Sequence, residues 1–273
     1  MTLHRGARIL AGMDWDALVL RAGHRVRAWG RLVRDEQGDW FDPPHGEPLV
    51  LIDPRPVSRP FSGAVPVTGA DFGAVTRRYE RDGGVEGWAT VTGTWTGGLI
   101  RIERQSRRRP PQAPAARRQV PPCPPPPDGW PTGMNGRYQD RLDFDVGDLQ
   151  ETGAAVTIAT FRPGPHQAVL VVAAADARVV EGWLRPQLGP RLCVVPSRWT
   201  KREIDAVRNH LYDRFAAWNI YRLVVETLDD AQARVTAELT RVLPEIAAWA
   251  ASLPPGILGL DPWLRPAHPA PSG

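Results

Sequence analysis

A segment rich in proline and arginine, residues 105–131, divides this chain of 273 residues into two parts. It carries three consecutive arginines and a dense series of prolines. Such a segment buries little apolar surface and favours extended polyproline II conformations. It either holds two domains apart or lies across the second one, with Trp130 as its anchor. We therefore predict a first domain at 1–105, a linker at 106–136 and a second domain at 137–273.

The first domain has the sequence pattern of a small β-barrel. A hairpin is indicated where two strand-like runs meet at Gly97 and Gly98. Three strands, a helical pattern and this hairpin follow one another, which is the order expected of an OB-like Greek-key barrel. A small barrel of the SH3 type would have a similar pattern. The predicted elements are strands at 26–33, 49–52 and 65–68, a helix at 71–81, and hairpin strands at 85–95 and 99–103.

The clearest folding unit of the second domain lies at 191–225, where a strand, a tight turn, a long helix and another strand follow one another. Thr200 and Glu203 have the spacing of a capping box, in which each side chain bonds the backbone amide of the other residue. An apolar stripe at helical spacing follows and extends to Trp218. Asn219 is placed to end the helix in the left-handed conformation.

Further strands and helices surround this unit. From residue 191 onward the predicted order is βαββαβ, the split pattern of ferredoxin-like folds. We therefore predict an α+β protein of two domains, a small OB-like β-barrel followed by an α+β sandwich that contains the ferredoxin-like βαββαβ pattern. The other predicted elements of the second domain are strands at 142–146, 155–161, 168–174, 232–240 and 257–260, and helices that begin at Asp176 and Pro244.

The charge balance gives a weak basic bias, with 34 basic and 30 acidic residues and a net charge of +4. Nearly all basic residues are arginines, and Lys201 is the single lysine, a usage typical of high-GC genomes. We therefore do not take this balance as evidence for nucleic-acid binding. The N-terminus lacks the apolar core of a signal peptide, and no window reaches the ~18 uninterrupted apolar residues that span a bilayer. We expect a cytoplasmic protein that does not contact a membrane.

The sequence contains none of the common catalytic motifs. Phosphate-binding loops, the GxSxG nucleophile elbow, the HExxH zinc motif and the EF-hand loop are all absent. The six histidines are scattered, and none has a partner at metal-ligand spacing. We therefore expect no cofactor and no metal, predict no catalytic residue, and favour a protein that is not an enzyme.

The turn at 196–200 is a candidate anion site. Ser197 and Arg198 lie between the end of a strand and the start of a helix, where α/β folds bind phosphate and carboxylate groups. A serine and a surface arginine are also common at helix starts that bind no ligand. Both interpretations stay open, and the first would make the turn part of an enzyme or of an anion-binding domain.

Two cysteines, Cys123 and Cys193, are present. Cys193 lies inside a predicted strand, where a small buried hydrophobic side chain is the usual role of a cysteine. A bond between the two would close a loop of ~70 residues and contribute about 4 kcal/mol through chain entropy. A reducing cytoplasm opposes such a bond. The sequence leaves the pairing open.

Aromatic and basic residues of the predicted barrel form the main candidate binding surface. We predict that Trp88, Trp95 and Arg101 contribute to it, together with the linker. The absence of catalytic motifs favours a non-enzymatic binding or assembly protein with a protein partner. Single-stranded nucleic acid is the alternative ligand, because exposed aromatic rings stack bases and basic grooves follow phosphates. The sequence does not determine the oligomeric state.

Two phrases of the sequence carry a resemblance, PPCPPPPDGWP at 121–131 and RLCVVPSRWTKREIDAVR at 191–208. They are similar to uncharacterised actinobacterial proteins in which a proline-rich segment precedes an α/β domain. The resemblance covers the linker and the second domain, and it implies no activity, cofactor or site residue. It agrees with the high-GC bacterial origin indicated by the arginine usage.

Overall fold

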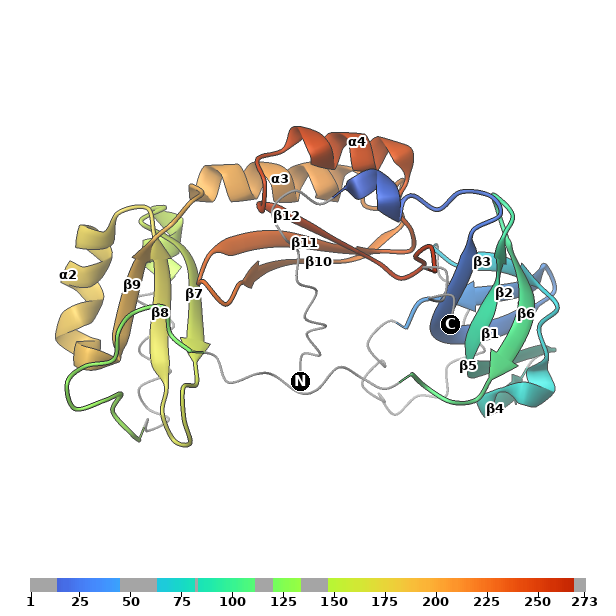
Figure 1. Cartoon of the computed structure of the whole chain (residues 1–273), viewed down its shortest axis with the longest axis horizontal. Helices are drawn as coiled ribbons and strands as arrows, with labels where there is room; N and C mark the ends of the chain where they lie inside the picture. Colours follow the sequence, from blue (N-terminus) through green and yellow to red (C-terminus); the bar gives the residue numbers. More distant parts are fainter. Residues whose placement is uncertain (1–13, 45–62, 82, 111–119, 134–146, 268–273) are drawn as a thin grey trace, which may run out of the picture.

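The computed structural model describes residues 14–44, 63–81, 83–110, 120–133 and 147–267. The protein is a mixed α/β protein in which most of the regular structure is strand, arranged in three sheets (Figure 1). The sheets follow one another along an arch, with a six-stranded sheet at one end and two three-stranded sheets beyond it (Figure 1). The strands predicted at 49–52 and 142–146 lie outside the described residues.

The first sheet curls into a partial ring. Its strand order is β1-β2-β3-β6-β5-β4, and β1 also pairs with β5, the strand next to the far end of the order. The β3–β6 pair is parallel, and the other pairs are antiparallel. The strands are β1 (Arg25–Asp35), β2 (Gly38–Asp42), β3 (Val65–Thr68), β4 (Thr76–Arg81), β5 (Gly84–Trp95) and β6 (Ile100–Ser106).

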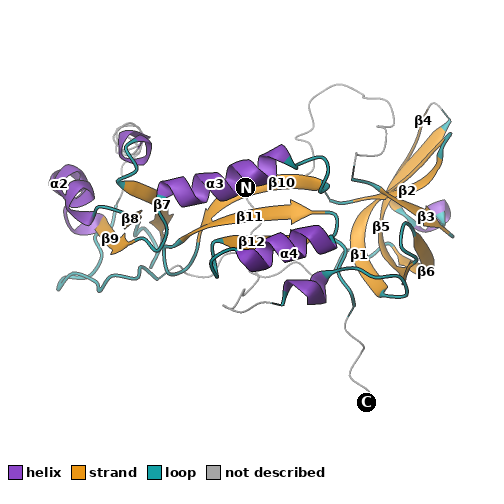
Figure 2. Cartoon of the chain, turned by 90° about the horizontal axis from the view of Figure 1, so that it is seen from above, coloured by secondary structure: helices purple, strands orange, loops and turns teal. Residues whose placement is uncertain are grey.

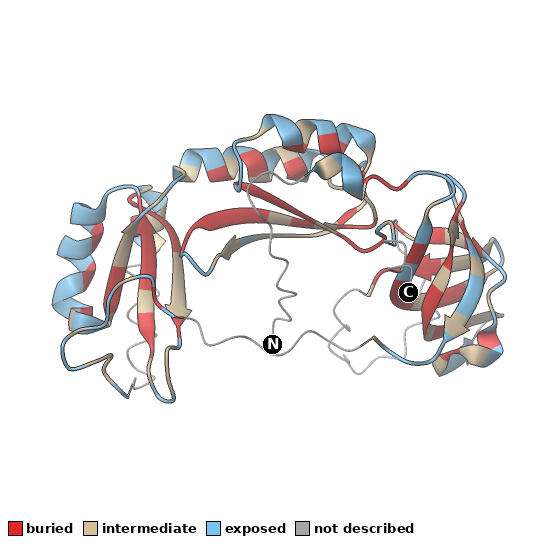
Figure 3. Ribbon diagram, viewed as in Figure 1, coloured by how far each residue is buried: buried red, intermediate tan, exposed pale blue. Residues whose placement is uncertain are grey.

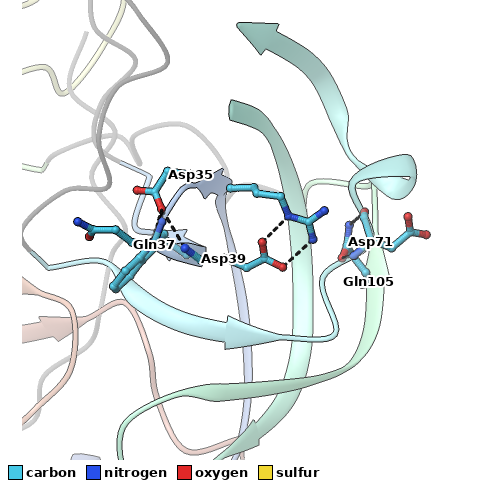
Figure 4. Close-up of polar contacts among 8 residues, drawn as sticks. Asp35, Gln37, Asp39, Asp71 and Gln105 are labelled. Carbon is cyan, nitrogen blue, oxygen red and sulfur yellow. Dashed lines mark hydrogen bonds and ion pairs between the residues drawn. The ribbon is translucent and has the colours of Figure 1, made fainter. Parts of the chain in front are cut away.

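The helix predicted at 71–81 is wrong. Asp71 caps only a short 3-10 turn, η2 (Phe72–Ala74), and the chain then continues as β4 along β5. Phe72 and Val75 are buried, as a helix would also have required. Residues 76–81 form a strand because they pair along an edge of β5. This pairing satisfies the backbone amides and carbonyls that a helix would have satisfied with its own hydrogen bonds. Gln105 of β6 fixes the turn, since it accepts from the amide of Asp71 and donates to its carbonyl (Figure 4).

The turn between β1 and β2 is packed against η2. Asp35 accepts hydrogen bonds from the amide of Gln37 at 2.8 Å and so closes the turn (Figure 4). Asp39 pairs through both carboxylate oxygens with Arg34, at 2.6 and 2.8 Å. The guanidinium of Arg34 in turn lies 4.6 Å above the ring centroid of Phe72. These contacts close one end of the partial ring.

The C-terminal residues complete the core of the first sheet. Trp263 and Leu264 are buried among its apolar side chains. The indole Nε1 of Trp263 donates to the carbonyl of Trp29 at 2.9 Å, and its ring lies 4.6 Å from that of Phe41. Residues from both sides of the predicted boundary at 137 therefore share one core.

The central layer of the arch is a three-stranded sheet with two helices on one face (Figures 1 and 2). The capping box of Thr200 and Glu203 is confirmed, and Asn219 adopts the predicted left-handed conformation at φ 50°. The helix itself ends earlier than its apolar stripe, but Trp218 is still buried in the same core. The elements are α3 (Lys201–Asp213), β10 (Ile220–Thr227), β11 (Ala233–Leu239), α4 (Pro244–Ser252) and β12 (Leu258–Pro262), with strand order β10-β11-β12.

The third sheet lies at the other end of the arch, and α2 (Ala177–Leu188) covers one of its faces. Buried residues of α2 face the sheet, while its outer side is exposed (Figure 3). Asp176 caps this helix as predicted. The strands are β7 (Ala155–Phe161), β8 (Val169–Ala174) and β9 (Leu192–Pro196), in the order β7-β8-β9.

The elements predicted from residue 191 onward occur in the expected order, but they belong to two sheets. After the crossover through α2, β9 pairs in parallel with β8. The chain then leaves this sheet through α3, and β10 pairs with β11 in the central layer. A single ferredoxin-like sheet therefore does not form, because sequence order alone does not fix which strands pair.

The proline-rich segment (residues 120–133) lies against the face of the third sheet that α2 leaves uncovered. Cys123 is disulfide-bonded to Cys193 of β9, which settles the question that the sequence left open. Trp130 packs into the same apolar cluster, and its carbonyl accepts from the side-chain amide of Gln167 at 2.8 Å. The segment therefore lies across the third sheet and does not only hold two parts of the chain apart, and Trp130 anchors it there.

Candidate binding face

The outer face of β1, β5 and β6, which we name the binding face, carries a pair of stacked tryptophans. The rings of Trp29 and Trp88 have centroids 6.0 Å apart and an interplanar angle of 21°. In the β1–β5 register, Trp29 lies opposite Thr90 and Arg31 lies opposite Trp88. Residues that lie directly opposite each other in a pair share a face, so both rings belong to the same side of the sheet. Trp29 is buried beneath its neighbours, whereas Trp88 keeps part of its surface exposed.

Arginines and threonines extend the binding face in two rows beside the tryptophans. Each row crosses three strands and places a threonine of β5 between an arginine of β1 and an arginine of β6. Rows on one face are separated by two residues along the strand, or ~6.7 Å. All four arginines are exposed. The first row contains Arg25, Thr94 and Arg101, and the second contains Arg27, Thr92 and Arg104.

The carboxylates of the binding face are already paired. Glu103 accepts from the hydroxyl of Thr94 at 2.6 Å and from the guanidinium of Arg25 at 3.0 Å. The hydroxyl contact, followed by the charges of Arg25 and Arg101, lowers the pKa of Glu103. Among the residues that the structure describes, Arg27 and Arg104 have no carboxylate within ion-pair distance. The face therefore carries an excess of positive charge.

The residues that follow β6 border this face. The hydroxyl of Thr90, which is buried, donates to the carbonyl of Arg108 at 2.7 Å. Arg107 donates to the carbonyl of Gly73 at 2.5 Å. These two contacts hold the exposed arginines at 107–109 beside the tryptophan pair, which adds further positive charge to the edge of the binding face.

Trp88 and Arg101 therefore belong to one surface, but Trp95 does not. Trp95 is 1% exposed and lies in the core of the first sheet, with the guanidinium of Arg241 4.7 Å from its ring centroid. Side chains of a strand alternate between its two faces, and Trp88 and Trp95 are seven positions apart, so they point to opposite faces. Including Trp95 in the predicted surface was wrong for this reason.

The backbone amides of residues 197–199 and the hydroxyl of Ser197 already donate hydrogen bonds inside the protein. The amide of Ser197 donates to Ala174, and the amide of Arg198 donates to the side chain of Gln232 at 2.7 Å. The hydroxyl of Ser197 donates within the turn, and the guanidinium of Arg198 pairs with Asp230 at 2.9 Å. The turn is thus fixed by its own contacts and by the β10–β11 connection, which argues against the predicted anion site.

A cavity of about 410 Å³ lies in a different place, between the short helix at 147–151 and α2. Its apolar wall includes Leu149, Val179 and Trp183. Val179 is 41% exposed and Trp183 is 50% exposed, so the two form a small apolar patch at the rim of the cavity. Asp148, Thr152 and Asp176 form the polar part of its lining.

No protein-family model, curated protein or solved structure matches this chain. Within the described ranges, no three histidine, cysteine, aspartate or glutamate residues are grouped so that they could hold a metal ion. None of the helices that the structure describes combines the length and the apolar character needed to cross a membrane.

Proposed function

We propose that this protein is a non-enzymatic binding protein whose binding face accommodates single-stranded nucleic acid. The observation that carries the proposal is the position of two arginine–threonine–arginine rows beside the Trp29–Trp88 pair. Proteins that bind single strands combine basic side chains along the backbone with aromatic rings that stack the bases. Arginine suits this role because its planar guanidinium can make two parallel hydrogen bonds to a phosphate.

The strand pairing supports an OB-like interpretation of the first sheet. An OB-fold is a five-stranded, partly open Greek-key barrel, and its strand face and connecting loops bind oligonucleotides. Here β1 pairs with both β2 and β5, and β3 pairs in parallel with β6, so five of the six strands can be followed around the ring. A fold alone does not define a function. The proposal therefore depends on the residues of the binding face.

Each group on the binding face has a separate part in the proposed complex. Trp88 offers the exposed part of its ring for stacking, and Trp29 supports it from below. Arg27 and Arg104 supply charge that no carboxylate of the described chain neutralises. Thr92 lies between them and presents a hydroxyl, a group that commonly contacts phosphate and sugar oxygens. These contacts involve the sugar–phosphate backbone and the flat faces of the bases, so we expect little sequence preference.

A labelled oligonucleotide of about 12 nucleotides, within the range of site sizes for OB-folds, provides the test. Its fluorescence anisotropy would be measured against the full chain at about 50 mM salt, where phosphate contacts are strong. We expect saturable binding that is weakened about tenfold by Trp88→Ala and by the Arg27→Gln/Arg104→Gln pair. Arg178→Gln, an exposed change on α2, is the matched control and should bind like the unaltered chain. Absence of binding, or equal binding by all variants, would refute the proposal.

A protein partner, which the absence of catalytic motifs in the sequence favours, is the second candidate. It is favoured by the exposed apolar pair on α2, because Val179 and Trp183 are four residues apart and line the same cavity. Exposed apolar patches of this kind mark protein contact surfaces. Trp183→Ser would weaken such a contact and leave oligonucleotide binding unchanged, which separates the two functions.

A further inference from the structure

The proline-rich segment shows a threefold pattern of exposure along the third sheet. A polyproline II helix has three residues per turn, so residues three apart lie on the same edge. One edge of the segment is partly buried, and the other two edges are exposed between residues 122 and 127. The edge toward the sheet contains Cys123 and Pro126; the exposed edges contain Pro122 and Pro125 on one side and Pro124 and Pro127 on the other. A turn, in which the amide of Gly129 donates to the carbonyl of Pro126 at 2.8 Å, ends the pattern.

Both ends of this exposed run are fastened to the sheet. At the start, Pro121 is buried and Cys123 is covalently bonded to Cys193. At the end, Trp130 packs into the apolar cluster and its carbonyl accepts from Gln167. The backbone of Gly133 adds a hydrogen bond of 2.9 Å to His166. The prolines are therefore held in place by contacts outside the run, which leaves their own rings available.

The chemistry of the run fits one kind of partner. Proline rings fix the backbone dihedral φ and lack an amide donor, so the segment gains little by joining a sheet. A polyproline II helix has no internal hydrogen bonds, and its carbonyls can accept from a partner. Grooves lined with aromatic side chains, as in SH3 and WW domains, bind segments with the spacing P-x-x-P. Two such pairs lie on exposed edges, Pro122 with Pro125 and Pro124 with Pro127.

We propose that the run at 122–127 is a docking ligand for a second protein that has an aromatic-lined groove. The disulfide and the Trp130 anchor order the run before it meets the partner, so the entropy of ordering is lost during folding and not during binding. The run belongs to the third sheet and the binding face to the first. The two surfaces are separate, and this inference does not rest on nucleic-acid binding.

An isolated SH3 domain and an isolated WW domain, each labelled with a fluorophore, serve as defined probes. Each would be titrated with the full oxidised chain and followed by anisotropy. We expect saturable binding of at least one probe, and a loss of about fivefold or more for Pro125→Ala and for Pro124→Ala. The control is Pro165→Ala, which alters an exposed proline in the turn between β7 and β8 and should change nothing. Thermal unfolding curves should coincide for all variants, because each altered ring is exposed.

Each result of these titrations either supports the proposed docking role of the run at 122–127 or overturns it. No binding of either probe at about 1 mM protein, or an equal effect of Pro165→Ala and Pro125→Ala, overturns the inference. Reduction of the disulfide should weaken probe binding, because Cys123 would no longer fix the start of the run. Pro125→Ala should bind the oligonucleotide as the unaltered chain does. Failure of this inference would therefore be distinguishable from failure of the proposed function.

Discussion

Cys123 and Cys193 are joined by a disulfide, and their Cα atoms lie 5.7 Å apart although 70 residues separate them in the sequence. Cys193 is buried in β9, and Cys123 belongs to the segment that lies on the same sheet. The loop that the bond closes includes β7, β8 and α2. A covalent link across so long a loop restricts the unfolded chain far more than it restricts the folded one.

Loss of this disulfide should lower the free energy of unfolding by about 4 kcal/mol, the chain-entropy value for a loop of this length. Urea denaturation of the unaltered chain, with and without a reductant, measures the effect without changing a side chain. The Cys123→Ser/Cys193→Ser variant is the control, and its stability should not respond to the reductant. A chain that is equally stable in both conditions would contradict the prediction.

Alanine at Gly30 should destabilise the first sheet by about 1–3 kcal/mol, the range for an overpacked core. A methyl group there would collide with the carbonyl oxygen of Asp42 and lie 2.7 Å from a ring carbon of Trp263. The backbone of β2 would have to move away from β1. Gly98→Ala is the control, because nothing lies within 4 Å of its added methyl group. Equal urea midpoints for the two variants would contradict this packing.

His210 should make the protein less stable as the pH falls. Its ring stacks on Trp249 at 4.3 Å, and burial, followed by the charge of Arg214, lowers its pKa against the opposing effect of Asp213. The unfolded chain, with a histidine pKa of about 6.5, then binds the proton first on acidification. Stability is therefore lost as the pH falls from that value toward the lower pKa of the folded state.

His210→Phe keeps an aromatic ring on Trp249 and removes the titration. Between about pH 7 and pH 5, its free energy of unfolding should fall less than that of the unaltered chain. Arg178→Gln, an exposed change on α2 that removes no group titrating in this range, is the control and should keep the original pH dependence. Parallel pH profiles for His210→Phe and the unaltered chain would count against the role of His210.

The salt dependence of oligonucleotide binding should reveal the phosphate contact that each arginine of the two rows makes. For single strands, each phosphate contact contributes about 0.7 to the slope of log K against log salt. Arg104→Gln should therefore lower the magnitude of the slope by about this amount, and Arg178→Gln should leave it unchanged. Anisotropy titrations at several salt concentrations supply the slopes. If Arg104→Gln left the slope unchanged, Arg104 would not contact a phosphate.

Elements with local signals were predictable from the sequence. The capping box of Thr200 and Glu203 depends on neighbouring residues only, and it is confirmed. Asn219 is left-handed as predicted, but α3 ends at Asp213, so Asn219 does not close the helix. The conformation of 71–81 depends on β5, a partner that its own pattern does not reveal. In the same way, β9 joins β8 and not the central sheet because of contacts that sequence order leaves undefined.

The candidate site was predictable only in part. Trp88 and Arg101 were identified, but Arg27, Arg104 and Thr92 were not, because a register between strands had to be known. A signal was nevertheless present, since Arg, Arg, Trp and Arg alternate with apolar residues or glycine at 25–31. This period of two places all four side chains on one face of a strand. The alternating threonines of β5 carry the same information.

Burial of Trp263 and Leu264 in the first sheet has a consequence for synthesis of the protein. The six strands of that sheet leave the ribosome well before these two residues are added. At about 5–20 residues per second, the delay is roughly 10–30 s. During that interval the nascent sheet exposes apolar side chains that its last partners will cover. Chaperones that hold nascent chains should therefore engage this polypeptide through its earliest strands.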